Sequence, residues 1–174
     1  MFKRLRLLKN KFYKRTQTEA LRLHALNVLR KASKKKLQHL PIAEYQYDPK
    51  LAVEELGIEH ELVMQLLDDY VAQTIKAIVQ FQEYIDVLQN SQNSHEKLDY
   101  THFKELAHKN LGVARNLRIK DAELLLEELM KQEDIEYLIE CLEALKACAI
   151  RLSPECAYDT LKLIEVKNTL LKDY

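Results

Sequence analysis

The sequence of 174 residues contains few residues that interrupt regular structure, with only two glycines and three prolines. An all-β protein needs many tight turns, and those turns depend on glycine and proline more than on most residues. Long helices need few turns, and the prominent leucine, lysine, glutamate and alanine all favour the helical state. The composition therefore predicts an all-α protein. Hydrophobic residues make up 47% of the chain, which is enough for the core of one domain.

Cysteines and long apolar runs are scarce as well. The three cysteines, Cys141, Cys148 and Cys156, have no Cys-x-x-Cys spacing and are odd in number, so they indicate neither a disulfide framework nor a zinc site. No apolar run approaches the roughly 20 residues that span a bilayer. The N-terminus also lacks the apolar segment of a secretory signal. We therefore predict a cytoplasmic protein that holds no metal and no cofactor.

Charge is distributed unevenly along the chain, although the formal net charge is zero. Residues 1–40 hold 13 Lys or Arg and a single acid, Glu19, which leaves 14 basic and 26 acidic residues in the rest. Such a basic segment can dock on an anionic membrane surface, on nucleic acid or on an acidic partner. The alternative is that it packs on its own acidic body. No motif indicates sequence-specific reading of nucleic acid.

Capping residues and apolar periodicity predict where the helices lie. Thr16-Gln17-Thr18-Glu19 has the form of a capping box, which predicts a helix from there to about residue 36. Asp48-Pro49 predicts the start of a short helix that stops at Gly57. Ser153-Pro154 is expected to cap the last helix. Other helices are expected over residues 59–89, 99–118, 120–131 and 134–152.

Long helices joined by short loops pack by default as an up-down four-helix bundle. We expect residues 47–152 to form that bundle. Residues 1–46 are then a basic helical extension, and residues 153–174 an accessory helix packed on the bundle. The helix over 99–118 is expected to turn four residues toward the interior: Phe103, Leu106, Val113 and Leu117.

One histidine of that helix, His108, lies at the border of the predicted apolar stripe. On a helix that advances about 100° per residue, four residues share its side: Lys104, Leu111, Gly112 and Arg115. Glycine costs a helix interior about 1 kcal/mol against alanine, so Gly112 needs an explanation. Either it leaves the imidazole open to a docking surface, or it lets a neighbouring helix approach closely. In the second case alanine at this position would destabilise the fold.

An exposed histidine beside cations can accept a phosphoryl group. An unprotonated ring nitrogen attacks the phosphorus, while positive charge and hydrogen-bond donors stabilise the oxygens of the transferred group. The candidates for that charge are Lys104, Lys109 and Arg115. The remaining histidines show no spacing typical of metal ligands. No metal on this chain is required, because a partner protein can supply it.

The segment AHKNLGVARNL, residues 107–117, resembles the signature of the histidine-containing phosphotransfer (HPt) domains of bacterial two-component phosphorelays. Four of its residues fall at the family's positions: His108, Gly112, Asn116 and Leu117. The segment LGIEHELVMQLLDDYVAQTIKAI is similar to the family's preceding helix, and DAELLLEELMKQEDIEYLIECLEAL to its two closing helices. The resemblance covers about residues 47–152. Three positions depart from the family: Asn110 replaces the usual leucine, Leu111 the usual lysine and Arg118 the usual glycine.

The resemblance implies an HPt-like bundle in which His108 relays phosphoryl groups between receiver-domain aspartates. The partners would be a response-regulator receiver domain, which would carry the Mg²⁺, and/or a hybrid histidine kinase. The protein would be a monomeric phosphocarrier rather than an enzyme that turns over. Five residues would stabilise the phosphoryl group or dock the partner: Lys104, Lys109, Leu111, Gly112 and Arg115. The alternative is an HPt-shaped module that docks a receiver or kinase without phosphotransfer, tethered by its basic N-terminal segment.

Overall fold

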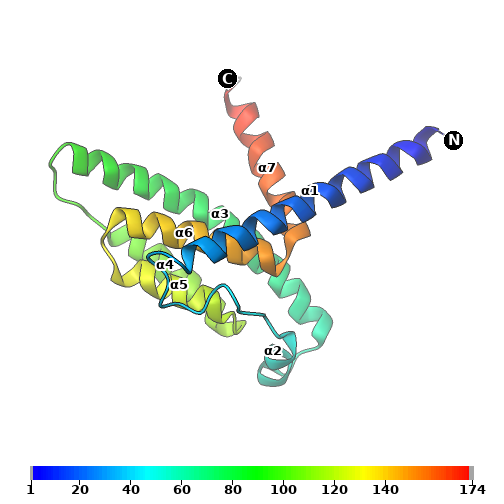
Figure 1. The fold of residues 1–174 in the computed structure, drawn as a ribbon, viewed down its shortest axis with the longest axis horizontal. Coiled ribbons are helices and arrows are strands. Elements are labelled where there is room, and N and C mark those ends of the chain that lie inside the picture. Colours follow the sequence, from blue (N-terminus) through cyan, green and yellow to red (C-terminus); the bar gives the residue numbers. More distant parts are fainter. Residues whose placement is uncertain (1, 173–174) are drawn as a thin grey trace.

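The computed structural model describes residues 2–172, with side chains described for residues 9–171. This part of the chain contains seven helices and no strand, which confirms the all-α prediction (Figure 1). The helices are α1 (Phe2–Ala32), α2 (Pro49–Leu56), α3 (His60–Asn93), α4 (Thr101–Asn116), α5 (Lys120–Lys131), α6 (Ile135–Leu152) and α7 (Pro154–Lys172).

Local capping signals explain where several helices begin and end. The Asp48 carboxylate accepts a hydrogen bond from the Lys50 amide, and Pro49 occupies the first turn of α2. Gly57 ends that helix with φ of +64°, the left-handed conformation that glycine adopts at little cost. The Asp134 carboxylate caps α6 in the same way as Asp48 caps α2, by accepting from the Tyr137 amide. The predicted bounds of α2, α5 and α6 are therefore confirmed to within one residue.

Two other capping predictions are wrong. The helix predicted to begin at the capping box of residues 16–19 instead begins at Phe2, because no glycine or proline interrupts the chain before it. The Thr16 hydroxyl donates to the Phe12 carbonyl, one turn back, and Glu19 pairs with Arg22. The Ser153 hydroxyl does not cap α7 either. It donates to the Asp68 carboxylate at 2.7 Å and so ties the start of α7 to α3.

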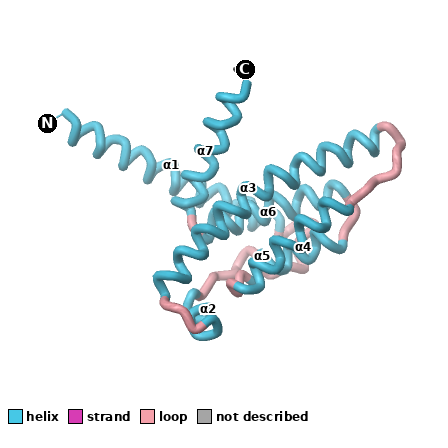
Figure 2. The backbone as a smooth tube through the Cα atoms, turned by 180° about the vertical axis from the view of Figure 1, so that it is seen from behind, coloured by secondary structure: helices cyan, strands magenta, loops and turns pink. Residues whose placement is uncertain are grey.

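Four helices, α3 to α6, enclose the core. α3 packs against α4 and α6, and α5 packs against the same two helices, so the four form a closed ring. The Phe81 and Phe103 rings, 4.9 Å apart at their centroids, join α3 to α4 inside it. α2 packs against α3 at one end of the ring (Figure 2). Further fully buried side chains come from all four helices and include Ile75, Ile85, Leu125, Leu126, Leu129 and Leu138.

The terminal helices lie on one side of this ring. α1 packs on α6 through Ala25, Leu29 and Ala32, and it also contacts α7, which lies on α3 and α6. Within the described residues neither α1 nor α7 packs against α4 or α5. The N-terminal half of α1 and the C-terminal half of α7 project away from the ring, on the side opposite to α4 and α5 (Figures 1 and 2). The outer side of α4 is therefore left free by both.

Candidate functional site

Helix α4 presents one side to solvent, and His108 lies on it. His108, Lys109, Gly112 and Arg115 are exposed and Lys104 is half-buried. We call these five residues the α4 face. Because α4 packs only on α3 and α5 among the described helices, no other helix covers this surface. The structure thus brings together the predicted histidine, its glycine and its three cations on one accessible side of a helix.

Leu111 is the exception among the predicted site residues. Helical spacing predicted that Leu111 shares the side of His108, but its side chain is only 3% exposed and packs in the core. The interior stripe of α4 consists of Phe103, Ala107, Leu111, Ala114 and Leu117. Val113, which was predicted to face inward, is 37% exposed. The predicted stripe was rotated because it gave weight to large apolar residues and ignored two buried alanines. Leu111 therefore does not belong to the α4 face.

The structure also decides between the two explanations of Gly112. A Cβ built at this position would meet no atom within 4 Å apart from its own helix and chain neighbours. The close approach of another helix is therefore wrong as an explanation. What remains is open space at Gly112, one turn beyond His108.

Two of the three cations are held by carboxylates. The Lys104 ammonium donates to the Glu133 carboxylate and lies 5.7 Å from the centre of the Tyr100 ring. The Arg115 guanidinium donates to Glu127 of α5 at 2.9 Å. Lys109 has no carboxylate partner within the described chain. The α4 face therefore combines two cations held by carboxylates with one, Lys109, that forms no ion pair within the described residues.

Glu127 joins α4 to α5 through two cations. Its carboxylate accepts from Arg115 and, at 3.2 Å, from Lys131 one turn along α5. These two hydrogen bonds, that of Arg115 first, hold the pKa of Glu127 below its ordinary value of 4.5. Glu127 is therefore ionised at neutral pH. It pairs with the Arg115 guanidinium, although the Arg115 side chain remains 53% exposed.

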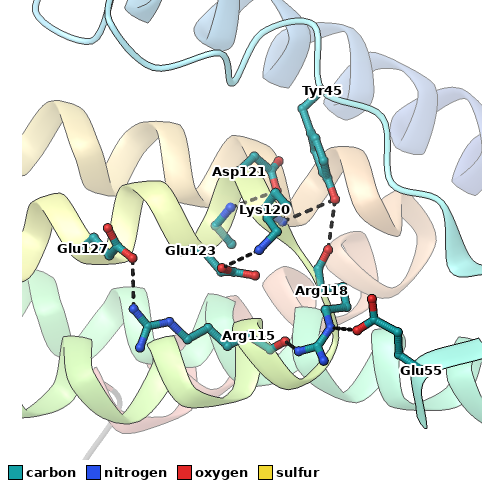
Figure 3. A network of polar contacts seen from close by, with 9 residues as sticks. Tyr45, Glu55, Arg115, Arg118, Lys120, Asp121, Glu123 and Glu127 are labelled. Carbon is teal, nitrogen blue, oxygen red and sulfur yellow. Dashed lines mark hydrogen bonds and ion pairs between the residues drawn. The ribbon is translucent and has the colours of Figure 1, made fainter. Parts of the chain in front are cut away.

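The turn after α4 is held in place by the segment that connects α1 to α2, where no site residue was predicted. The Tyr47 hydroxyl donates to the Leu117 carbonyl at 2.9 Å, and the Tyr45 hydroxyl donates to the Arg118 carbonyl at 3.1 Å. The Lys120 amide donates back to the Tyr45 oxygen (Figure 3). Two tyrosines at alternate positions of an extended segment point to the same side. That spacing is the signal that would have found them.

Arg118 has an unusual backbone in the same turn. Its φ is +59°, a left-handed conformation that costs residues other than glycine roughly 1–2 kcal/mol. The guanidinium offsets part of this cost, since it donates to the Glu55 carboxylate and, at 2.6 Å, to the Arg115 carbonyl (Figure 3). These contacts connect the end of α4 to α2.

A buried ion pair lies behind the turn. The Arg151 guanidinium of α6 donates to the Asp121 carboxylate of α5 at 2.7 Å, and both side chains are largely buried. Arg151 also donates to the Ala43 carbonyl at 3.0 Å, which fastens the connecting segment to α6. The partners are all within the fold, so this pair supports the position of α5 and of the turn rather than forming a site of its own.

The described residues offer little to a metal ion or a thiol reaction. Within residues 9–171, no three His, Cys, Asp or Glu side chains lie close enough together to hold a metal ion. Burial raises the pKa of Cys141 to about 12 and that of Cys148 well above its ordinary value. Both thiols therefore stay protonated near neutral pH. No helix in the described part of the chain combines the length and the apolar character needed to cross a membrane.

Comparison with known proteins gives no relative: no family model, no curated protein and no solved structure matches this chain. The interpretation of the α4 face therefore depends on its own residues and their geometry.

Proposed function

We propose that the protein is a phosphorelay intermediate, which accepts and donates a phosphoryl group on His108 between receiver-domain aspartates of a two-component system. In this proposal α3 to α6 form an HPt-like up-down four-helix bundle in the cytoplasm. The observation that carries it is the exposure of His108 on α4, beside the open space at Gly112. The protein would act as a monomer with two partners in turn: a receiver, which would carry the Mg²⁺, and a second receiver or a hybrid histidine kinase.

Arg118 gives further support to the proposal. HPt domains usually have glycine at this position, and the φ of +59° is a conformation that favours glycine. A backbone requirement of that kind persists even where the residue has changed. Here the contacts of the Arg118 side chain with Glu55 and the Arg115 carbonyl would offset the cost of a left-handed backbone at a residue other than glycine.

The transfer step needs a neutral imidazole. Its unprotonated nitrogen attacks the phosphorus of the receiver's aspartyl phosphate, an N–P bond forms, and the P–O bond to the aspartate breaks. The electron pair of the broken bond leaves on the aspartate, which is again a free carboxylate. The other ring nitrogen keeps its proton. The return transfer to a second aspartate reverses each of these changes.

The cations of the α4 face would have different roles in this step. Lys109 is free of carboxylates among the described residues and can move to the phosphoryl oxygens. Lys104 and Arg115 already bind Glu133 and Glu127. They would have to exchange those partners for the oxygens, or else would orient the receiver at the rim. Leu111 takes no part, since it lies in the core.

The experiment that tests the proposal is phosphoryl transfer from a radiolabelled, phosphorylated receiver domain to the full chain. The label should appear as an acid-labile, alkali-stable phosphohistidine and should be absent from His108→Gln. His102→Gln is the matched control, because His102 is also exposed on α4, where it contacts Glu105 and stacks on the Tyr84 ring. Label that persists on His108→Gln, or that is lost from His102→Gln alone, would contradict the assignment.

A second function is favoured by the same ion pairs. With Leu111 in the core and two cations neutralised by glutamates, only Lys109 offers unpaired charge on the described α4 face. An HPt-shaped module that docks a receiver or kinase without accepting phosphate needs no more than that. It predicts equal receiver binding by the wild type and His108→Gln in calorimetry, with no phosphohistidine from any donor. Transfer to the wild type would exclude it.

A further inference from the structure

The N-terminal half of α1 leaves the body of the protein. Its last described tie is the ion pair between Lys14 and Asp159 of α7, at 2.8 Å. Before that point Lys9 and Lys11 are exposed, Phe12 is 74% exposed and Tyr13 is 63% exposed. Two aromatic rings therefore lie in water beside these cations. This half of the helix projects freely in both views of the fold (Figures 1 and 2).

Most of the described cations on this projecting half form no ion pair with the rest of the protein. Within the described residues Lys9, Lys11 and Arg15 have no carboxylate within ion-pair distance, in contrast to Lys14. The sequence adds three more cations, Lys3, Arg4 and Arg6. The acidic body accounts only for the other half of α1 and the turn behind it, where Lys36 pairs with Glu136 of α6. Among the described residues, therefore, only the second half of the basic segment packs on the body.

Helix α7 projects from the same side and exposes an apolar surface. Leu163 is 71% exposed, and Val166, Leu170 and Leu171 are each more than half exposed. Both projecting ends point away from α4 and α5 (Figure 2). The molecule therefore has a basic and aromatic arm beside an apolar arm on one side, and the α4 face on the other.

We propose that the projecting halves of α1 and α7 attach the protein peripherally to an anionic lipid bilayer. The cations of α1 would contact the lipid phosphates, and Phe12, Tyr13 and Leu163 would enter the headgroup region. Nucleic acid would satisfy the cations but would leave the apolar side chains in water, which is why lipid is the partner that fits. This attachment goes beyond the function of His108 and does not depend on it. It would leave the α4 face directed away from the membrane and open to a soluble partner.

The test is cosedimentation of the full chain with vesicles of phosphatidylcholine mixed with phosphatidylglycerol, and with vesicles of phosphatidylcholine alone. Binding should require phosphatidylglycerol and weaken as salt is added, because salt screens the lipid charge. Replacing Lys9, Lys11 and Arg15 together by glutamine should lower the partition coefficient on the order of 100-fold at low salt. Phe12→Ser should lower it about tenfold.

A matched control removes the same number of positive charges from the body of the protein instead of from the projecting half of α1. Lys34, Lys35 and Lys50 are exposed, have no ion pair in the described residues and lie on the body. Replacing these three by glutamine should leave vesicle binding within about twofold, since none of them lies on the projecting half of α1. Equal loss in both triple variants would show diffuse attraction and would overturn the assignment to α1.

Other results would overturn the proposal in different ways. Absence of binding to the mixed vesicles would exclude an anionic bilayer outright. Stronger binding to duplex DNA, lost in the α1 triple variant but unchanged in Phe12→Ser, would identify nucleic acid phosphate as the partner instead. Phosphoryl transfer to His108 should be unchanged in every arm variant, so failure of the membrane proposal and failure of the phosphorelay proposal give separate results.

Discussion

The α4 face and the projecting half of α1 are both exposed helical surfaces that carry cations, but they differ in what lies behind them. Behind the α4 face is the core stripe with Phe103 and Leu111, and two of its cations are oriented by glutamates. At the described positions from Lys9 to Thr16, the projecting half of α1 buries no side chain in the core, and its cations form no ion pair except at Lys14. A held surface can position one reacting atom, whereas a free one suits a partner without fixed geometry, such as a membrane.

The largest expected difference comes from removing one large apolar side chain from each helix. Leu111→Ala should lower the free energy of unfolding by about 3 kcal/mol, because it leaves a cavity in the core. Phe12→Ala should change it by less than about 0.5 kcal/mol, because the ring is mostly in water. Urea unfolding followed by circular dichroism measures both. Similar losses would mean that the projecting half of α1 has a core side after all.

The position of Leu111 also shows how much of the site the sequence could predict. The exposure of His108, the helix that carries it and the cations beside it follow from the apolar periodicity of residues 99–118. The rotation of the apolar stripe did not follow, because Ala107 and Ala114 contribute little to the hydrophobic pattern and yet are fully buried. The roles of Tyr45 and Tyr47 depend on contacts with residues about 70 positions away. Only the folded chain brings those together.

The predicted start of α1 was wrong because a local signal was given too much weight. A capping box is a local signal, and it competes with whatever helical propensity precedes it. The residues before Thr16 contain neither glycine nor proline, so the helix continues through the box. Local signals did predict both ends of α2, where Pro49 occupies the first turn and Gly57 ends the helix.

Replacing each of the two glycines, Gly112 and Gly57, by alanine should have opposite effects on stability. Gly112→Ala should stabilise the protein by up to about 1 kcal/mol, since the new methyl group meets no atom and alanine favours a helix. Gly57→Ala should destabilise it by roughly 1–2 kcal/mol, because alanine is strained at φ of +64° although its methyl group also has space. Thermal or urea unfolding gives the sign of each. Loss of stability in Gly112→Ala would restore the explanation by close helix packing.

Gly112→Ala also tests the function of the open space. If the clearing serves a docking partner, phosphoryl transfer from the receiver should slow in this variant although its fold is more stable. Unchanged transfer would leave the glycine without a role in docking. Slower transfer would therefore distinguish a docking surface on α4 from a helix side that is merely exposed.

A smaller effect is expected from the ion pair that orients Arg115. Arg115→Gln should raise the pKa of Glu127 toward its ordinary value of 4.5, since it removes the first of the two hydrogen bonds that lower it. The depressed pKa contributes stability above pH 4.5 that is lost as the pH falls through the folded-state pKa. Because the pair is partly exposed, its contribution near neutral pH is below about 1 kcal/mol. Carboxyl titration by NMR measures the shift, and an unchanged midpoint would mean that Arg115 is free.

The smallest effect on stability is expected for the cations of the projecting half of α1. Replacing Lys9, Lys11 and Arg15 together by glutamine should change the free energy of unfolding by less than about 0.5 kcal/mol, because these exposed side chains form no ion pair in the described fold. Relief of repulsion along one basic helix would even make the change slightly favourable. Lys14→Gln breaks the pair with Asp159 and serves as the positive control, with a loss of a few tenths of a kcal/mol. A triple variant that unfolds more easily than Lys14→Gln would show that the arm is bound to the body, and the contrast with α4 would then disappear.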